Sequence, residues 1–84
     1  MSDLKAKFEA ASVAVKNLAN PGNNVKLQLY ALYKQGSVGD VQGERPGFTD
    51  IVGRAKYDMW ASFKGISQDE AMQKYIDLVE SLAG

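Results

Sequence analysis

Apolar residues recur every three or four positions along most of this chain, and this spacing constrains its fold more than any other feature. Such spacing places the apolar side chains on one face of an α-helix. No stretch reads as a strand, because glycine and proline interrupt each short apolar run. We therefore predict helices over residues 3–18, about 24–35, about 50–64, and from position 67 onward. The stripe of the first helix consists of Leu4, Phe8, Ala11, Val15 and Leu18.

Local signals mark the ends of these helices. Gly36 follows the second helix and can supply a left-handed C-terminal cap. The third helix is expected to start at Thr49 or Asp50, whose side chains suit an N-cap. Ser67 and Glu70 have the spacing of a capping box, which is the clearest helix start in the chain.

A long glycine-rich segment separates the second and third helices. Residues 36–49 form a loop of fourteen residues that contains four glycines and one proline. A loop of this length in so small a domain is usually functional or packed by its own side chains, here Val38, Val41 and Phe48. The 84 residues are enough for one domain, residues 1–84, with a single core. We predict an all-α four-helix bundle with one long crossover.

The composition limits the chemistry that the chain can perform. It has no cysteine and no histidine, which removes disulfides, the commonest metal ligand and the commonest general base. Ten basic residues balance ten acidic ones, so we expect no nucleic-acid partner. The N-terminal residues lack an apolar run, and no stretch is long enough to span a bilayer. We expect a cytoplasmic, monomeric binding protein with no metal, cofactor or catalytic activity.

The second helix carries a second face besides its apolar stripe. Leu27, Tyr30 and Lys34 lie within about 60° of one another, opposite the stripe that the core needs. An apolar group, a phenol and an ammonium together suit a ligand that is part apolar, part aromatic and part anionic. A helix buried on both sides, with Lys34 extending to water, accounts equally for this pattern. A rival function is a helical protein-interaction module that grips a partner helix with this face.

Five segments follow one another in a specific order and spacing: LYALYKQ (29–35), VGD (38–40), ERPG (44–47), GRAKYDMW (53–60) and AMQKYI (71–76). Through these segments the chain resembles the acyl-CoA-binding protein family, from about residue 8 to residue 82. The resemblance implies a four-helix bundle in up-down-down-up order, in which the third helix crosses the other three. It also implies a non-catalytic intracellular carrier and buffer of medium- to long-chain fatty acyl-CoA, with transient contact to membranes or to enzymes that use acyl-CoA.

The resemblance also implies the residues that hold the ligand. In the family an aromatic at the place of Tyr33 stacks on adenine, while groups at Tyr30, Lys34 and Lys56 address the 3′-phosphate. The acyl chain lies in an apolar groove toward the start of the second helix. The expected ligand contacts are Tyr30, Tyr33, Lys34, Lys56, Tyr75 and Lys16, and the expected groove residues are Val25 and Leu27.

Some of these positions have a plain structural explanation as well. Tyr75 lies in the middle of the apolar stripe of the fourth helix, where a core residue is expected. Lys16 lies off the stripe of its own helix and fits a solvated surface equally well.

Three positions depart from the pattern of the family. Tyr57 stands where tryptophan is usual, Gly36 replaces a frequent alanine, and Val52 occupies a place that is often lysine. If the charge of that lysine is missing from the CoA site, Lys16 or Arg54 would have to supply it.

Overall fold

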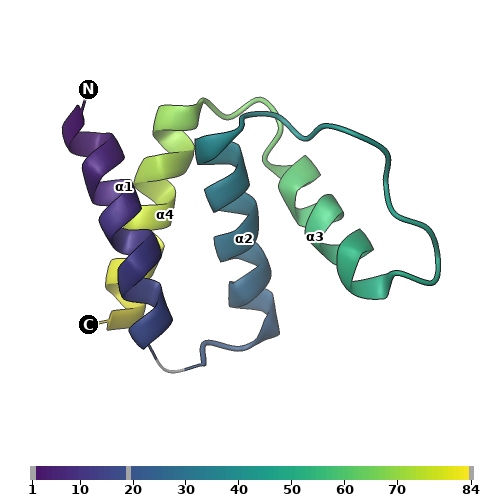
Figure 1. Cartoon of the computed structure of the whole chain (residues 1–84), viewed down its shortest axis with the longest axis horizontal. Helices are drawn as coiled ribbons and strands as arrows, with labels where there is room; N and C mark the ends of the chain where they lie inside the picture. The colour runs from purple at the N-terminus through teal and green to yellow at the C-terminus, as the bar shows by residue number, and fades with distance from the viewer. Residues whose placement is uncertain (1, 19, 84) are drawn as a thin grey trace.

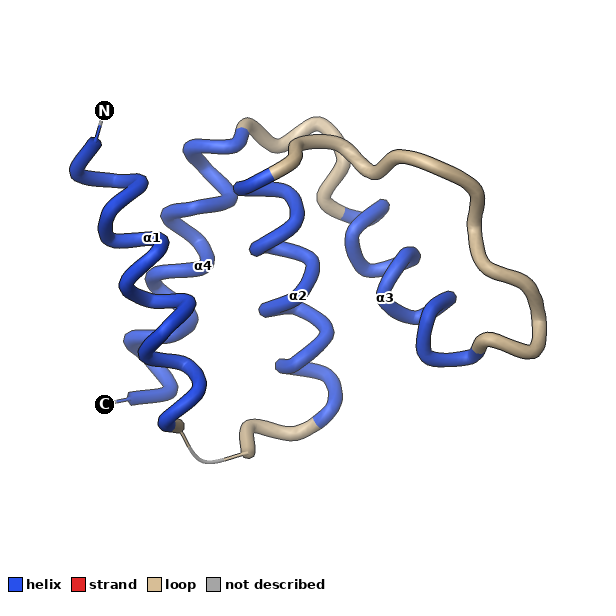
Figure 2. Tube along the Cα trace, in the orientation of Figure 1, coloured by secondary structure: helices blue, strands red, loops and turns tan. Residues whose placement is uncertain are grey.

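The computed structural model describes residues 2–18 and 20–83, which contain four α-helices and no strand (Figure 1). Loops join the helices at both ends of the molecule (Figure 2). No helix within the described residues is long and apolar enough to cross a membrane. The predicted all-α fold is confirmed. The elements are α1 (Ser2–Ala14), a 3-10 turn η1 (Val15–Asn17), α2 (Asn23–Ser37), α3 (Ile51–Ser62) and α4 (Gln68–Ala83).

The helices form a flat bundle with extents of 38 × 29 × 15 Å. Helix α4 packs against both α1 and α2, and the main packing partner of α3 is α2. In Figure 1, α1 and α4 run in one direction, while α2 and α3 run in the other. This is the up-down-down-up order that the resemblance implies, but α3 lies beside α2 and does not cross all three of the other helices. Because α3 lies on the outer side of α2, the first halves of these two helices face each other across a shared surface.

The core lies between α1, α2 and α4. Full burial of a large apolar side chain contributes roughly 1.5–3 kcal/mol, so a few such residues account for much of the stability of a small domain. The fourth helix supplies half of the cluster. Its buried members are Phe8, Ala11, Leu29, Leu32, Ala71, Tyr75, Ile76 and Val79.

The second helix ends later than predicted. It continues through Gly36 to Ser37, so the prediction of a left-handed cap at Gly36 was wrong. The left-handed residue is Gly39, with a φ of 103°. A Cβ on Gly36 would lie 3.0 Å from Cζ of Phe8 and 3.1 Å from Cγ of Met72, so glycine at this position leaves room for these two side chains against α2.

The first helix is shorter than the predicted span 3–18. It ends at Ala14, and the next turn tightens to the 3-10 form, in which the N–H of Leu18 donates to the carbonyl of Val15 at 3.2 Å. Leu18 itself is extended, with φ −86° and ψ 156°. The apolar spacing continues to Leu18 because its side chain still packs on the core after the helix has ended.

Asp50 and Ser67 both act as N-caps, but only one of the two hydrogen bonds of the predicted capping box at Ser67 and Glu70 is formed. Oδ1 of Asp50 accepts a hydrogen bond from the N–H of Gly53 at 2.9 Å, and Oγ of Ser67 accepts one from the N–H of Glu70 at 3.0 Å. Each bond satisfies a backbone donor that the first turn of a helix leaves free. The Glu70 carboxylate lies 4.0 Å from the ammonium of Lys74.

The long loop is held by hydrogen bonds to α3. Nε1 of Trp60 donates to the carbonyl of Gly39 at 2.8 Å, and the hydroxyl of Tyr57 donates to the carbonyl of Gly43 at 2.9 Å. The prediction that Phe48 packs the loop from inside was wrong, because its side chain is 87% exposed. Polar contacts from α3 therefore hold this loop in place. Tyr57, which departs from the family pattern, makes one of these contacts.

An ion pair adds to these contacts. The guanidinium of Arg45 forms two hydrogen bonds with the carboxylate of Asp58, at 2.8 and 2.7 Å. Each group favours the charged form of the other, so the pKa of Asp58 is lowered and that of Arg45 is raised. This paired geometry orients the loop, although exposure to water limits its contribution to stability.

A buried glutamine joins the end of α2 to the turn before α4. Nε2 of Gln35 donates to Oδ1 of Asp40 at 2.9 Å and to the carbonyl of Ile66 at 2.8 Å. Asp40 also accepts a hydrogen bond from the N–H of Gly65 at 2.9 Å. The Gly65 N–H, and next the Gln35 amide, hold the pKa of Asp40 below its ordinary value.

Candidate functional site

A groove of about 370 Å³ lies between the first halves of α2 and α3. We call it the α2–α3 groove. Its lining is mostly apolar, with cationic groups from both helices. Such a groove can hold an apolar chain while its cations meet an anionic group at the rim. The lining residues are Asn23, Lys26, Leu27, Tyr30, Ile51, Val52, Ala55 and Lys56.

The lysine and tyrosine predicted on different helices meet in this groove. Nζ of Lys56 lies 5.3 Å from the centroid of the Tyr30 ring. A cation at this distance is attracted to the ring face. The Lys56 side chain is exposed and Tyr30 is half-buried, so the ammonium stays in contact with water while the ring forms part of the wall.

Lys34 makes a similar contact one turn further along α2. Its Nζ lies 5.1 Å from the centroid of the buried Trp60 ring, whose Nε1 is bonded to the long loop. The face formed by Leu27, Tyr30 and Lys34 is therefore turned toward α3. This arrangement leaves Leu27 and Tyr30 as one wall of a groove within the molecule, whereas a module that grips a partner helix needs an open face.

On the side of α2 away from the groove, Tyr33 forms an aromatic cluster with Phe8 of α1 and Tyr75 of α4. The ring of Tyr33 stacks on Phe8 with centroids 5.3 Å apart, and Tyr75 meets Phe8 edge-on at 5.2 Å. Tyr33 is 41% exposed, whereas Tyr75 is buried in the core. Burial, and to a smaller extent the neighbouring Tyr33, raises the pKa of the Tyr75 hydroxyl above its ordinary value.

A second hollow, of about 430 Å³, lies beside this aromatic cluster. Phe8 and Tyr33 line it together with polar residues from the start of α4, such as Gln68 and Asp69. An aromatic wall beside hydrogen-bonding groups suits a flat heterocycle such as a purine base. Tyr33 is the predicted site residue that opens onto it.

Four of the predicted site residues line neither of these two hollows: Lys16, Val25, Lys34 and Tyr75. Lys16 is exposed on η1, and Val25 packs against the core cluster from the start of α2. The sequence reasoning also missed a basic residue in the α2–α3 groove, Lys26. Its spacing of four from Tyr30 could have revealed it, because residues four apart share one face of a helix.

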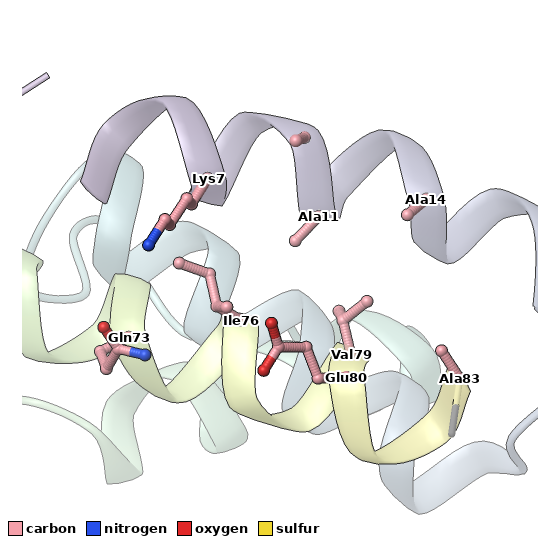
Figure 3. Close-up of a pocket in the computed structure, with 9 residues that line it drawn as sticks. Lys7, Ala11, Ala14, Gln73, Ile76, Val79, Glu80 and Ala83 are labelled. Carbon is pink, nitrogen blue, oxygen red and sulfur yellow. The ribbon is translucent and has the colours of Figure 1, made fainter. Parts of the chain in front are cut away.

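A further hollow, with a volume of about 530 Å³, lies between α1 and α4. In Figure 3, Ile76 and Val79 point from α4 toward α1, where Ala11 faces them. Lys7 and Glu80 also line this hollow. With no aromatic side chain and one cation offset by a carboxylate, its lining suits a phosphorylated aromatic ligand poorly.

Comparison with known proteins agrees with the sequence and the fold. Residues 5–79 match the family model described as Acyl CoA binding protein. The chain is 45% identical over 76 residues to Acyl-CoA-binding protein homolog 1 of Caenorhabditis elegans, which covers 89% of this chain and 88% of that protein. It is 47% identical over 77 residues to the Acyl-CoA-binding protein homolog of Drosophila melanogaster, with 90% of each chain covered.

A solved structure supports the same assignment. The crystal structure of Oryza sativa Acyl-CoA-Binding Protein 2 superposes with a TM-score of 0.94 at 40% identity, covering 98% of this chain and 90% of that one. The relatives from worm and fly are matched along nearly their whole length and are named as binding proteins. We conclude that the chain belongs to the acyl-CoA-binding protein family and is, like these stand-alone relatives, an acyl-CoA-binding protein.

Proposed function

We propose that the chain is an intracellular carrier and buffer of medium- to long-chain fatty acyl-CoA esters, bound one to one with the acyl tail in the α2–α3 groove. The main support for this proposal is the set of residues that line the groove. Leu27 and Ala55 offer an apolar lining, and Lys56 stands over the ring of Tyr30 at its edge. One groove thus addresses both the apolar and the anionic part of an acyl-CoA ester.

The apolar lining accounts for binding of the tail. Each methylene removed from water contributes roughly 0.8 kcal/mol before the loss of freedom on binding is subtracted. Val52, in the place of a family lysine, adds apolar surface to this groove. We expect affinity to rise with chain length and then to level off when the groove is filled.

The CoA half is assigned to the edge of the groove and to the part of α2 beyond it. We assign the 3′-phosphate to Lys34, Lys56 and the Tyr30 hydroxyl, and the adenine to the exposed face of Tyr33. Charge-assisted bonds from lysine to phosphate are roughly twice as strong as neutral ones. Tyr75 then supports the adenine site indirectly, because it packs against Phe8, and Tyr33 is stacked on Phe8.

Two further assignments follow from the charges. Lys16 is proposed to meet an outer phosphate of CoA from its exposed place on η1. Where the family often has lysine at the position of Val52, we propose that Lys26 supplies the charge, since it lines the same groove. Arg54 is less suited to this role because its guanidinium lies 4.6 Å from the ring centroid of Phe48.

The setting of this function is also a proposal. We propose a cytoplasmic monomer that meets membranes and acyl-CoA-using enzymes transiently. The equal numbers of acidic and basic residues support the absence of a nucleic-acid partner.

Calorimetry with palmitoyl-CoA, free CoA and palmitate tests the proposed function. We expect one-to-one binding of palmitoyl-CoA, and binding of each fragment weakened by several kcal/mol, because separate parts of one site hold the two halves. Leu27→Asn should weaken palmitoyl-CoA and leave free CoA unchanged. The control is Glu80→Gln, because Glu80 is exposed and lines the α1–α4 hollow. Val79 lines the same hollow but belongs to the buried core, so Val79→Asn is unsuitable as a control. Equal affinity for palmitoyl-CoA and palmitate would contradict the proposal.

A further inference from the structure

The two lysines that we assign to the 3′-phosphate each lie over an aromatic ring of the other helix. Nζ of Lys34, on α2, lies 5.1 Å from the centroid of the Trp60 ring on α3. Nζ of Lys56, on α3, lies 5.3 Å from the centroid of the Tyr30 ring on α2. Both distances are within the range of roughly 6 Å over which a ring face attracts a cation. Tyr30 is itself assigned to the ligand, whereas Trp60 is buried, so its ring can act on the ligand only through Lys34.

A closed chain of contacts connects the ammonium of Lys34 to the backbone of the same residue. The carbonyl of Lys34 accepts hydrogen bonds from the N–H of Val38 at 2.8 Å and from the N–H of Gly39 at 3.2 Å. The carbonyl of Gly39 accepts the hydrogen bond from Nε1 of Trp60 at 2.8 Å. The Trp60 ring then meets the ammonium of Lys34. The ring is therefore held in a fixed place relative to the helix that carries the lysine.

Gly39 closes this chain through its backbone conformation. Its φ is 103°, a value at which residues with a side chain are strained. In this conformation its N–H bonds back to the end of α2, while its carbonyl bonds to α3. Tryptophan is in turn the side chain whose ring face attracts a cation most strongly.

We propose that Trp60 is the positioning residue for Lys34, and that it holds the ammonium in place before the ligand arrives. The inference rests on the proposed function, in which Lys34 binds the 3′-phosphate. A lysine side chain is long and flexible, and it loses rotamer freedom when it binds an anion. Lys34 is half-buried and lies over the ring, so part of this freedom is already lost in the free protein. Its N–H donors on the side away from the ring are directed at the phosphate.

The ratio of two affinities tests this role. Calorimetry gives, for each variant, the affinity for palmitoyl-CoA divided by the affinity for its 3′-dephospho form, which we call the phosphate ratio. Trp60→Leu keeps an apolar side chain and removes the ring. It should lower the phosphate ratio roughly three- to tenfold, the effect of immobilising one long side chain on binding. A merely structural loss would weaken both ligands alike and leave the ratio unchanged.

Two comparisons confine this effect to Lys34. In a Lys34→Ala background, Trp60→Leu should not change the phosphate ratio any further, because the side chain that Trp60 positions is gone. Phe63→Leu is the matched control, since Phe63 is an aromatic residue at the end of α3 that packs against the core cluster. Its phosphate ratio should equal that of the wild type.

Two glycines of the long loop provide a test that leaves Trp60 in place. Gly39 and Gly43 have φ values of 103° and 84°, and the carbonyl of each accepts a hydrogen bond from an aromatic side chain of α3. Gly39 is bonded to Lys34 and Trp60, whereas the donor to Gly43 is Tyr57. Gly39→Ala and Gly43→Ala should strain the loop similarly, but Gly39→Ala alone should lower the phosphate ratio. This pair decides the question even if Trp60→Leu fails to fold.

Proton chemical shifts give a readout that needs no ligand. Protons that lie over the face of an aromatic ring resonate upfield of their usual position. The ε-methylene protons of Lys34 should therefore resonate upfield of those of Lys7, which lines a hollow without aromatic residues. This difference should disappear in Trp60→Leu.

Lower phosphate ratios in Trp60→Leu and Gly39→Ala, with unchanged ratios in the two control variants, support the inference. An unchanged ratio in Trp60→Leu, equal losses in the two glycine variants, or Lys34 protons without an upfield shift would overturn it and leave the proposed function intact. Failure of the wild type to bind palmitoyl-CoA would instead overturn the proposed function, and the inference with it.

Discussion

The ammonium of Lys56 on α3 lies 5.3 Å from the centroid of the Tyr30 ring on α2. This pair connects the two helices that form the α2–α3 groove, and it places a positive charge beside an apolar cavity. Because Lys56 remains exposed, its charge keeps contact with water and is free to meet an anion that approaches from outside. The pair is the structural basis for assigning the phosphate of the ligand to this edge of the groove.

Removal of Lys34 or of Lys56 should weaken ligand binding. We expect Lys34→Ala and Lys56→Ala each to lose about 1.5–3 kcal/mol of acyl-CoA affinity, the magnitude of a hydrogen bond to a charged partner. Thermal stability should change little, because neither residue belongs to the buried core cluster. Calorimetry and melting curves on both variants measure the two effects.

Lys7→Ala is the matched control for these variants, because Lys7 lines the α1–α4 hollow. Its affinity for acyl-CoA should equal that of the wild type. The 3′-dephospho form of the ligand tests the phosphate directly. If it binds the wild type as tightly as the complete ligand does, the assignment of Lys34 and Lys56 to the 3′-phosphate is wrong.

The helices could be predicted from the sequence because their signals are local. The apolar stripe from Leu4 to Leu18 is visible from residues three or four positions apart, and the hydroxyl of Ser67 caps a residue three positions away. The structure contains both features. Gly36 misled the prediction because glycine suits a helix cap and close packing by a neighbouring side chain equally well. The positions of Phe8 and Met72, both distant in the sequence, decide between these two uses.

The two site tyrosines should respond differently to substitution. Tyr33→Ala should cost about 1–3 kcal/mol of binding, the value of one base stacked on an aromatic ring, and the protein should still fold. Tyr75→Phe keeps the core ring and removes a hydroxyl, so stability should change little. Titrations and melting curves on both variants decide between site and scaffold. A Tyr33→Ala variant that melts early yet binds normally would show that Tyr33 supports the fold and does not contact the ligand.

Substitutions of Trp60 test how much this residue contributes to holding the long loop. Trp60→Ala should destabilise the fold by about 3–5 kcal/mol, because it removes a buried ring and the hydrogen bond to the carbonyl of Gly39. Trp60→Phe keeps most of the ring and loses the donor, so its cost should be smaller. Chemical denaturation measures both. Equal stability of the two variants would show that ring burial contributes nothing beyond the hydrogen bond.

The site was harder to predict than the helices. Its two walls come from residues some 25 positions apart, and periodicity on α2 alone could show which face Tyr30 occupies without showing that α3 covers it. The loop contacts were invisible for another reason. The acceptors for Trp60 and Tyr57 are backbone carbonyls of Gly39 and Gly43, and every residue carries a carbonyl.

Gln35 should contribute to stability and not to binding. Gln35→Leu leaves the carbonyl of Ile66 and the carboxylate of Asp40 without their shared donor, which should cost about 1–3 kcal/mol. Gln28→Leu makes the same exchange at a half-buried position on the same helix and should cost less. Denaturant midpoints give the comparison. Equal midpoints for the two variants would show that the buried amide does not hold the turn.

The acid side of the stability profile should depend on Asp40. Its pKa is lowered in the folded protein, first by the Gly65 N–H and then by the Gln35 amide, so its charged form is favoured by folding. This contribution is complete above the ordinary carboxyl pKa of about 3.8 and is lost as the pH falls through the lower folded value. Asp40→Asn should therefore melt below the wild type near neutral pH, and the difference in Tm should shrink in acid. A difference that stays constant, or grows, as the pH falls below 3.8 would show that the charge of Asp40 does not stabilise the junction of α2 and α4.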